Sequence, residues 1–495
     1  MFPLCFLPIL LAALFLSFFV YYTSLPINFP RNIPIISIYA RLYDVLRGTT
    51  ETDFYNARVR HHAEKHGAVG IWLEGKWTVV ITKPDLLSQM FRDRTNSLAR
   101  CGLYQRVPEG IGAQLFGENI IDSDGDLHRH FRDIIKPGIE MRHNFTSLRY
   151  KSSQLAIRLI DIQETATDCS GAAIAEPVFW WSVSVFGEYF LDIEFDELKF
   201  LECNIQAILG AQNSSVIGRL EGLFPILGNL PWTWATTHQT RKRFHNLEAI
   251  LMDHVSRVPP PALLSKSQEK VIHRMNAAHL DGSMSDFHYK SNLKQLFVAG
   301  TENVEAVLVS AMLELAKSRL VLDRLYLELT RDLPTDYSET DVRQLPFLSA
   351  VIYETLRLYP PLAFMRNRLT KESYQLSEDI LLPADSVLGR HIYGLHTDPT
   401  VWSDACVFNP DRWGADIDAV YSMVRRLQAN GHFLPFGLHA RRCPGSPFAI
   451  TQLRIALCEL VRRLDWTLSP EYRFSFIDGG LLAPFGCKFV FSKRN

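Results

Sequence analysis

The sequence lacks an excess of charge of either sign, with 52 Lys and Arg against 53 Asp and Glu and a formal net charge of -1. It therefore lacks the strongly basic balance typical of nucleic-acid-binding proteins, and no nucleic-acid partner is expected. It also lacks internal repeats, low-complexity tracts and any interior linker rich in Gly, Ser or Pro. Because 47% of its 495 residues are hydrophobic, we expect one large globular unit and no extended disorder.

The eight cysteines lack any C-x-x-C pair and any regular spacing. A zinc cage requires ligands at short, recurring intervals, and disulfide frameworks belong mainly to small secreted domains. We therefore expect neither a zinc cage nor a disulfide framework here. Reduced, scattered cysteines are consistent with a domain that faces the cytosol.

Charged side chains are absent from the N-terminal segment between Phe2 and Phe29. Its apolar part, Phe2–Tyr22, would span roughly 31 Å as a helix, which matches the hydrocarbon core of a bilayer. A cleaved signal peptide is the alternative, but a basic start and a small-x-small cleavage site are missing. We therefore expect one transmembrane helix, with residues 1–25 as the anchor and start of a linker and residues 26–495 as the catalytic domain.

Basic residues follow the anchor, and the positive-inside rule places the catalytic domain in the cytosol. These residues are Arg31, Arg41 and Arg47. The expected location is the endoplasmic reticulum membrane, crossed once.

The body of the chain is predicted to be mainly α-helical with small β-sheets. Most of residues 84–317 has a helical pattern, whereas Gly67–Ile81 is typical of a hairpin that turns at Gly75. Further predicted elements are a helix at Leu345–Leu358, short strands at Leu376–Leu388, an amphipathic helix after Cys443 and a hairpin at Phe474–Phe491.

Residues 436–445 read FGLHARRCPG. This stretch resembles the haem-binding loop of cytochromes P450, F-G-x-G-x-R-x-C-x-G, which begins here at Phe436. The resemblance implies that Cys443 ligates the iron of haem b as a thiolate, and that Arg441 holds a haem propionate. Glycines let such a loop turn tightly and aim N–H groups at sulfur, and the following helix points its positive end at the thiolate. A buried structural cysteine is the alternative, but further motifs appear in the family's order.

Two of these motifs concern a structural network. Glu354-x-x-Arg357 places both side chains on one face of a helix, and Arg412 lies in FNPDRW, residues 408–413, which resembles the family's P-E-R-F/W segment. The resemblance implies a buried ion network of Glu354, Arg357 and Arg412 behind the haem loop. Breaking one member would leave a buried charge unpaired.

Another motif, AGTEN at residues 299–303, resembles the oxygen-binding segment A/G-G-x-D/E-T and lies about 140 residues before Cys443. The resemblance implies that Gly300 leaves room for dioxygen, while Glu302 and Asn303 deliver protons. A long helix is predicted here, from about Phe287 to Ser318. An ordinary core helix that tolerates a glycine is the alternative.

Weaker resemblances concern the haem propionates. GDLHRHFR, residues 125–132, is similar to the W-x-x-x-R helix, with Arg132 as the arginine and His128 in place of Trp, and Arg368 occupies another propionate position. The chain departs from the family's pattern at three positions. His128 replaces a Trp, His439 replaces a Gly, and Asn303 replaces the usual Thr, whose proton relay an amide could preserve in altered form.

The chain is thus identified as a member of the cytochrome P450 family, similar to the dityrosine-forming fungal branch in residues 66–91 and in AGTEN. This implies a haem-thiolate mono-oxygenase of fungal secondary or spore-wall metabolism, which hydroxylates or oxidatively couples a small, tyrosine-derived aromatic substrate. NADPH would supply electrons through NADPH-cytochrome P450 reductase. A reductase-independent isomerase or dehydratase and a non-catalytic haem sensor are the alternatives. The expected reductase-docking residues are Arg129, Arg132, Arg425, Arg426, Arg441 and Arg442.

Overall fold

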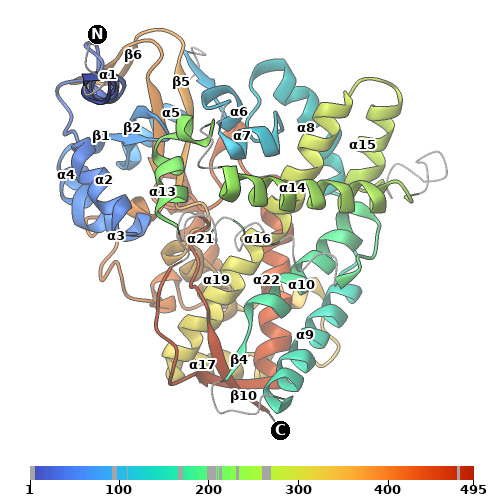
Figure 1. The fold of residues 1–495 in the computed structure, drawn as a ribbon. Helices are drawn as coiled ribbons and strands as arrows, with labels where there is room; N and C mark the ends of the chain where they lie inside the picture. The colour runs from blue at the N-terminus through green and yellow to red at the C-terminus, as the bar shows by residue number, and fades with distance from the viewer. Residues whose placement is uncertain are drawn as a thin grey trace.

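The computed structural model describes residues 6–91, 97–108, 110–165, 171–197, 204, 208, 210, 215–229, 234–258, 269–476 and 480–494. The fold is mainly helical with small β-sheets, as predicted, but the sheets do not lie at one side: Figure 1 shows strands toward both the top and the bottom of the molecule. The helices before the oxygen segment are α1 Phe6–Thr23, α2 Ile38–Leu46, α3 Glu51–Phe54, α4 Arg60–His66, α5 Pro84–Phe91, α6 Leu103–Arg106, α7 Ile111–Phe116, α8 Gly125–Ile139, α9 Thr146–Thr165, α10 Ala175–Phe186, α13 Val216–Leu223, α14 Trp234–Val255 and α15 Val271–Leu280. The later helices are α16 Asp286–Lys317, α17 Arg319–Asp332, α18 Glu339–Arg343, α19 Pro346–Leu358, α20 Ile392–His396, α21 Ile417–Ala429 and α22 Ser446–Arg463.

The largest sheet joins strands near the N-terminus to strands of residues 364–391. The strands are β1 Ala68–Leu73, β2 Lys76–Ile81, β3 Leu98–Arg100, β4 Ala172–Ala173, β5 Phe364–Thr370, β6 Tyr374–Ser377, β7 Ile380–Leu382, β8 Val387–His391, β9 Leu464–Leu468 and β10 Lys488–Lys493. Five of them form a sheet in the order β1-β2-β8-β5-β3, in which β2 and β8 are parallel. The predicted hairpin of β1 and β2 is confirmed, and Gly75 has the positive φ of 77° that its tight turn requires.

Two long helices, α16 and α22, cross the core and pack against each other (Figure 1). The predicted helix around residues 287–318 is confirmed as α16, which Ser285 caps by accepting a hydrogen bond from the His288 N–H at 3.2 Å. The prediction that α22 is amphipathic is wrong. Nearly every position from Ile450 to Val461 is buried, because neighbouring helices cover all its faces.

The predicted helix at Leu345–Leu358 is confirmed as α19, with Pro346 in its first turn. The side chain that caps it comes from another helix. Glu328 of α17 accepts hydrogen bonds from the Phe347 and Leu348 N–H groups at 2.7 and 2.8 Å. A carboxylate from α17 therefore satisfies the free donors at the start of α19.

The observed strands differ from the predictions in three respects. β5 was not predicted, and β3 and β4 interrupt the region expected to be helical. The expected C-terminal hairpin is wrong in its main pairing. Among the described residues of this segment, one bridge joins Phe476 to Pro484, while β10 pairs with β9, the strand that follows α22. Long-range pairing of this kind leaves no local turn signal in the sequence.

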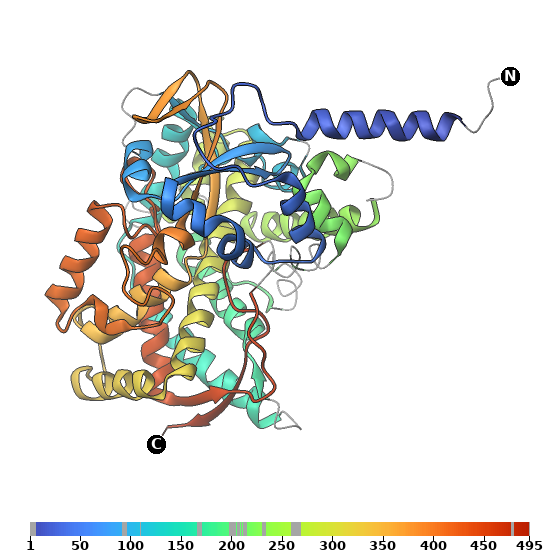
Figure 2. The ribbon, with the colours of Figure 1, turned by 90° about the vertical axis from the view of Figure 1, so that its left-hand side faces the viewer.

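The N-terminal helix α1 projects from the body as an isolated rod (Figure 2). Apolar side chains cover it, and Leu14, Phe15 and Leu16 are more than half exposed. Residues 1–5 of the predicted anchor lie outside the described part of the chain. Among the described helices, α16 alone meets the length and hydropathy expected of a membrane span, and two thirds of its span is buried in the core, while Leu10–Thr23 is a shorter apolar helix.

Candidate active site

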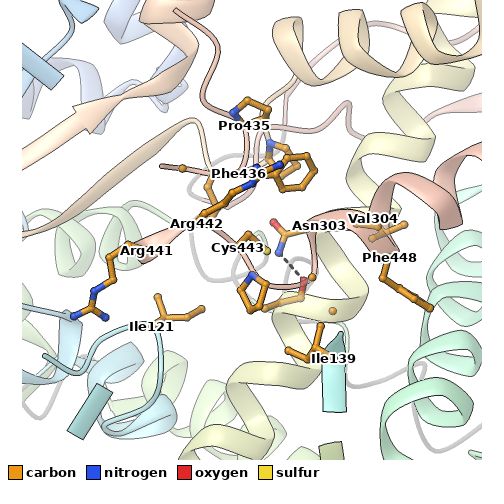
Figure 3. A pocket seen from close by; sticks show the side chains of 18 of the residues that line it. Ile121, Ile139, Asn303, Val304, Pro435, Phe436, Arg441, Arg442, Cys443 and Phe448 are labelled. Carbon is orange, nitrogen blue, oxygen red and sulfur yellow. Dashed lines mark hydrogen bonds between the residues drawn. The ribbon is translucent and has the colours of Figure 1, made fainter. Parts of the chain in front are cut away.

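A cavity lies between the loop of residues 435–445 and the middle of α16 (Figure 3). The loop contributes Phe436 and Cys443, and α16 contributes Asn303 and Val304 from the opposite wall. Two strands of the large sheet close one end with Met365 and Arg390. The lining is mostly aromatic and aliphatic, which is typical of a site for a flat, largely apolar group.

The Cys443 thiol opens onto this cavity. The loop is closed by the Cys443 N–H, which donates to the Phe436 carbonyl at 2.9 Å. Burial raises the pKa of Cys443, whereas the Gly445 and Ser446 N–H groups, which donate to Sγ, lower it. These donors stand at the start of α22, so the predicted approach of a helix N-terminus to the sulfur is confirmed.

Two residues of the loop have left-handed backbone conformations. Gly437 has a φ of 70°, which glycine adopts at no steric cost. His439 has a φ of 52° at the position where the family's pattern has glycine. The histidine at position 439 therefore adopts a backbone conformation that suits glycine, and this conformation is strained for histidine.

Arginine side chains gather at one end of the cavity. Arg100, Arg132, Arg390 and Arg441 line it together with His128. Burial, followed by the field of Arg368, lowers the pKa of Arg390 and of Arg441 to about 10. Burial, followed by the fields of Arg441, Arg132 and Arg100, lowers the pKa of His128 to about 4.

The positive charge at this end exceeds its local compensation. Arg441 donates to Asp124 at 2.9 Å and to the Ser123 carbonyl at 3.1 Å. In the described part of the chain, however, the buried Nε and Nη1 of Arg390 have no hydrogen-bond acceptor. Buried donors of this kind call for an anionic ligand. A cavity with a thiol in its wall and arginines at one end fits haem b, with Cys443 toward the iron and the arginines toward the propionates.

The predicted ion network lies behind the loop, with Glu354 and Arg357 fully buried and the Arg412 side chain 10% exposed. Glu354 accepts from Arg357 Nε and Nη2 at 2.9 and 2.8 Å and from Arg412 Nε at 2.9 Å. It also accepts from Trp413 Nε1 at 3.0 Å and from the Asn409 N–H at 2.8 Å. Arg357 donates further to backbone carbonyls of the segment that leads to the loop. The structure therefore brings Glu354, Arg357 and Arg412 together in one network.

The α16 wall differs in detail from the expectation. A Cβ at Gly300 would lie 2.4 Å from the Phe186 ring, so the close packing of α10 already requires glycine there. The Asn303 Nδ2 donates to the Ala299 carbonyl at 2.9 Å, one turn back in the same helix (Figure 3). Glu302 is buried but is not among the described residues that line the cavity. The oxygen segment thus presents Gly300 and Asn303 to the cavity and turns Glu302 away.

The sequence predicted only some of the arginines at this end of the cavity. Arg132, His128 and Arg441 line the cavity as expected, but Arg368 does not, although its charge reaches Arg100 and Arg390. Arg100 and Arg390 were missed. Arg390 lies two residues beyond the predicted strand end, in β8, where all five positions are buried, so no alternation of apolar and polar residues marked it.

Comparisons with known proteins agree with this site. The cytochrome P450 family description matches residues 39–485. The cytochrome P450 monooxygenase xanG of Aspergillus fumigatus is 31% identical over 465 residues, covering 92% of this chain and 86% of that protein. Cytochrome P450-DIT2 of Saccharomyces cerevisiae is 25% identical over 475 residues, covering 95% and 94%. Premnaspirodiene oxygenase of Hyoscyamus muticus is 24% identical over 431 residues, covering 83% and 82%. This chain therefore belongs to the cytochrome P450 family and is an oxidoreductase.

Proposed function

We propose that this protein is a haem-thiolate mono-oxygenase that hydroxylates or oxidatively couples a small, tyrosine-derived aromatic substrate in fungal secondary or spore-wall metabolism. The observation that carries the proposal is the largely apolar cavity onto which the Cys443 thiol opens. Phe186, Phe190, Val304 and Phe448 are among the residues that line it. Aromatic and aliphatic side chains favour a flat substrate and exclude water from it.

The protein's own residues would hold and orient the cofactor. Cys443 would bind the haem iron, which deprotonates a coordinating thiol, and the Gly445 and Ser446 N–H groups would stabilise the sulfur charge. Arg100, Arg390 and Arg441 would pair with the propionates. When bound, haem supplies dioxygen activation, driven by electron donation from the thiolate sulfur. Asn303 would order a water at the cavity wall through its free amide oxygen, since its nitrogen bonds Ala299.

The substrate class rests on resemblance and on the character of the cavity. The likeness to the dityrosine-forming fungal branch covers the β1–β2 region and the oxygen segment. The similarity to a fungal P450 monooxygenase, xanG, extends over most of the chain. The xanG similarity supports fungal mono-oxygenase chemistry, and the likeness to the dityrosine-forming branch supplies the small aromatic substrate class.

Electrons would come from NADPH through a membrane-bound reductase, and α1 would anchor the protein in the endoplasmic reticulum membrane with its catalytic domain in the cytosol. The 18 residues of α1 rise by roughly 27 Å, close to a bilayer core. Of the expected docking arginines, Arg132, Arg441 and Arg442 line the cavity. Arg442 is also exposed, as are Arg129, Arg425 and Arg426, and these four would steer an acidic reductase.

Product analysis tests this proposal. The full chain, reconstituted with haem and P450 reductase in vesicles, would be given NADPH and N-acylated tyrosine compounds. Mass spectrometry should show hydroxylated or coupled products that depend on NADPH. Products formed without reductase would instead support an isomerase or dehydratase. NADPH consumption that no substrate in a broad aromatic panel stimulates, with no product, would support a haem sensor.

A further inference from the structure

Helix α2 has the reverse of the pattern expected of a helix that faces water. Its charged side chains point inward, because Arg41 and Asp44 are only 5% and 6% exposed. Its outer face carries Tyr39, Tyr43 and Leu46, which are 67%, 50% and 45% exposed. These three positions are four and three residues apart, so they form one stripe along the helix. A helix in contact with water normally turns its charges outward and its large apolar groups toward the core.

The two inward charges of α2 have partners inside the fold. Arg41 donates to Glu51 of α3, and its guanidinium carbon lies 4.2 Å from the centre of the Phe54 ring. Asp44 accepts from the Arg58 Nε at 3.2 Å. The protein therefore compensates the buried charges itself, and the outer face of α2 is left with large apolar and aromatic side chains.

The start of α13 has the same pattern. Val216 and Ile217 are exposed there, whereas Glu221, the only acid of this helix, is buried. Helix α13 lies against α2, and the Arg219 Nε donates to the Val45 carbonyl at 2.8 Å. The exposed apolar side chains of these two adjacent helices are called the α2–α13 patch: Tyr39, Tyr43, Leu46, Val216 and Ile217.

The base of α1 packs against the elements that carry this patch. The Phe19 ring lies 5.8 Å from that of Phe224, the residue after α13, and the Tyr22 ring lies 5.3 Å from that of Trp72. The apolar cluster that these rings form includes buried residues of both α2 and α13. Figure 2 shows α1 leaving the body on the side where α13, in green, lies. An α1 helix inserted in a bilayer therefore holds the α2–α13 patch close to the surface of that bilayer.

The chemistry of the patch fits the interfacial layer of a membrane. Tyrosines are enriched at the level of the lipid headgroups, where the ring is buried and the hydroxyl stays hydrated. The exposed Arg47 donates through Nη1 to the Tyr43 hydroxyl at 2.6 Å, and anionic headgroups attract such a cation. The acids of α2 and α13 are both buried, so neither helix presents a carboxylate that would repel those headgroups.

We propose that the α2–α13 patch is a second membrane contact, which enters the interfacial layer of the bilayer beside α1. This inference rests on the proposed role of α1 as an anchor and goes beyond it. The patch adds exposed apolar area to that of the anchor, and such area binds the headgroup boundary of a bilayer. A second contact also restricts how far the catalytic domain tilts on the membrane.

Depth measurements on the full chain, loaded with haem and reconstituted in vesicles of phosphatidylcholine and phosphatidylserine, test this proposal. Nitroxide labels would be attached at Tyr39→Cys and, in a separate protein, at Ile217→Cys. Leu320→Cys is the matched control, because Leu320 is an exposed apolar residue of α17, at the opposite end of the molecule from α1 (Figure 1). The background protein would carry serine at the cysteines that compete for the label: Cys5, Cys169, Cys203 and Cys406.

The labels at Tyr39 and Ile217 should lose most of their collisions with a water-soluble nickel chelate and keep their collisions with oxygen, which concentrates in lipid. The label at Leu320 should collide with the chelate freely. Patch labels that meet the chelate as often as the Leu320 label would overturn the proposal. Loss of both kinds of collision would also overturn it, because another protein, such as a second copy of this chain, would then cover the patch.

A label at Leu14→Cys, within α1, separates this inference from the proposed anchor. A Leu14 label in lipid with both patch labels in water would leave the anchor in place and refute the second contact. A Leu14 label in water would refute the anchor, whereas the labels at Tyr39 and Ile217 would still decide whether the patch enters the membrane.

Added charge tests whether the apolar side chains of the patch hold it at the membrane. Tyr43→Asp together with Val216→Asp should return the Ile217 label to the chelate, because a carboxylate resists leaving water and is repelled by anionic headgroups. Both side chains are exposed, so the fold and the haem spectrum should not change. Leu327→Asp, the matched change on α17, should not move the label. An Ile217 label that stays out of reach of the chelate in the doubly charged protein would contradict the proposal.

Discussion

Replacement of Glu354 by glutamine should destabilise the protein strongly, because one carboxylate holds together the network behind the haem loop. It is completely buried and accepts five hydrogen bonds, three from Arg357 and Arg412 and one each from Trp413 and the Asn409 backbone. Glutamine keeps the shape but exchanges one accepting oxygen for a donating NH2 group. Two guanidinium groups would then remain without their shared counter-charge.

The expected loss follows from that geometry. Breaking a buried ion pair from one side costs about 3–5 kcal/mol, because the remaining charge stays buried and unpaired. At about 2 °C per kcal/mol for a large domain, the midpoint of thermal unfolding should fall by about 6–10 °C. Haem incorporation should fall with it, since Arg357 also ties down the backbone carbonyls of Ala405 and Val407 at 2.6 and 3.1 Å.

The assay compares Glu354→Gln with the parent by thermal unfolding and by the spectrum of the reduced protein with carbon monoxide. Asp323→Asn is the matched control, because it breaks an ion pair with Arg319 whose side chains are 43% and 52% exposed. Exposed pairs contribute about 0–1 kcal/mol, so this control should unfold within about 2 °C of the parent. A Glu354→Gln protein that unfolds at the same temperature as the control and binds as much haem as the parent would refute the reasoning.

Cys443→Ser should abolish the carbon monoxide spectrum typical of a thiolate-bound haem, and a variant that keeps this spectrum would exclude Cys443 as the ligand. Asn303→Ala should raise peroxide per NADPH and leave the haem spectrum intact, whereas a peroxide yield equal to the parent's would mean that the amide only bonds its own helix. His439→Gly should stabilise the loop by about 1 kcal/mol, because the left-handed backbone favours glycine, and a lower unfolding midpoint would contradict this. His396 accepts from the Leu434 N–H at 2.8 Å, and its pKa is lowered to about 3, by burial first, from 6.5. His396 stays neutral in the folded protein, whereas in the unfolded chain it binds a proton below about pH 6.5. The contribution of His396 to stability should therefore disappear as pH falls from about 6.5 to about 3. His396→Gln should reduce that acid sensitivity, and an unchanged pH profile of unfolding would count against it.

The sequence by itself determined the elements whose signals are local. The β1–β2 hairpin follows from runs rich in Val, Ile and Trp on either side of Gly75, and α19 from its helical pattern with Pro346 in the first turn. Glu354 and Arg357 were predictable as neighbours because three residues make almost one helical turn. The Cys443 loop was predictable because its residue types and spacing match one kind of metal site.

Only the tertiary structure decided what depends on packing between distant segments. Arg100 and Arg390 meet at the cavity because β3, β5 and β8 are adjacent in one sheet, and strand order is not encoded in any local pattern. The reason for Gly300 is likewise non-local, since Phe186 of α10 occupies the space of its missing side chain. Burial raises the pKa of the Glu305 carboxyl on α16, and that burial depends on how the neighbouring elements close around the helix.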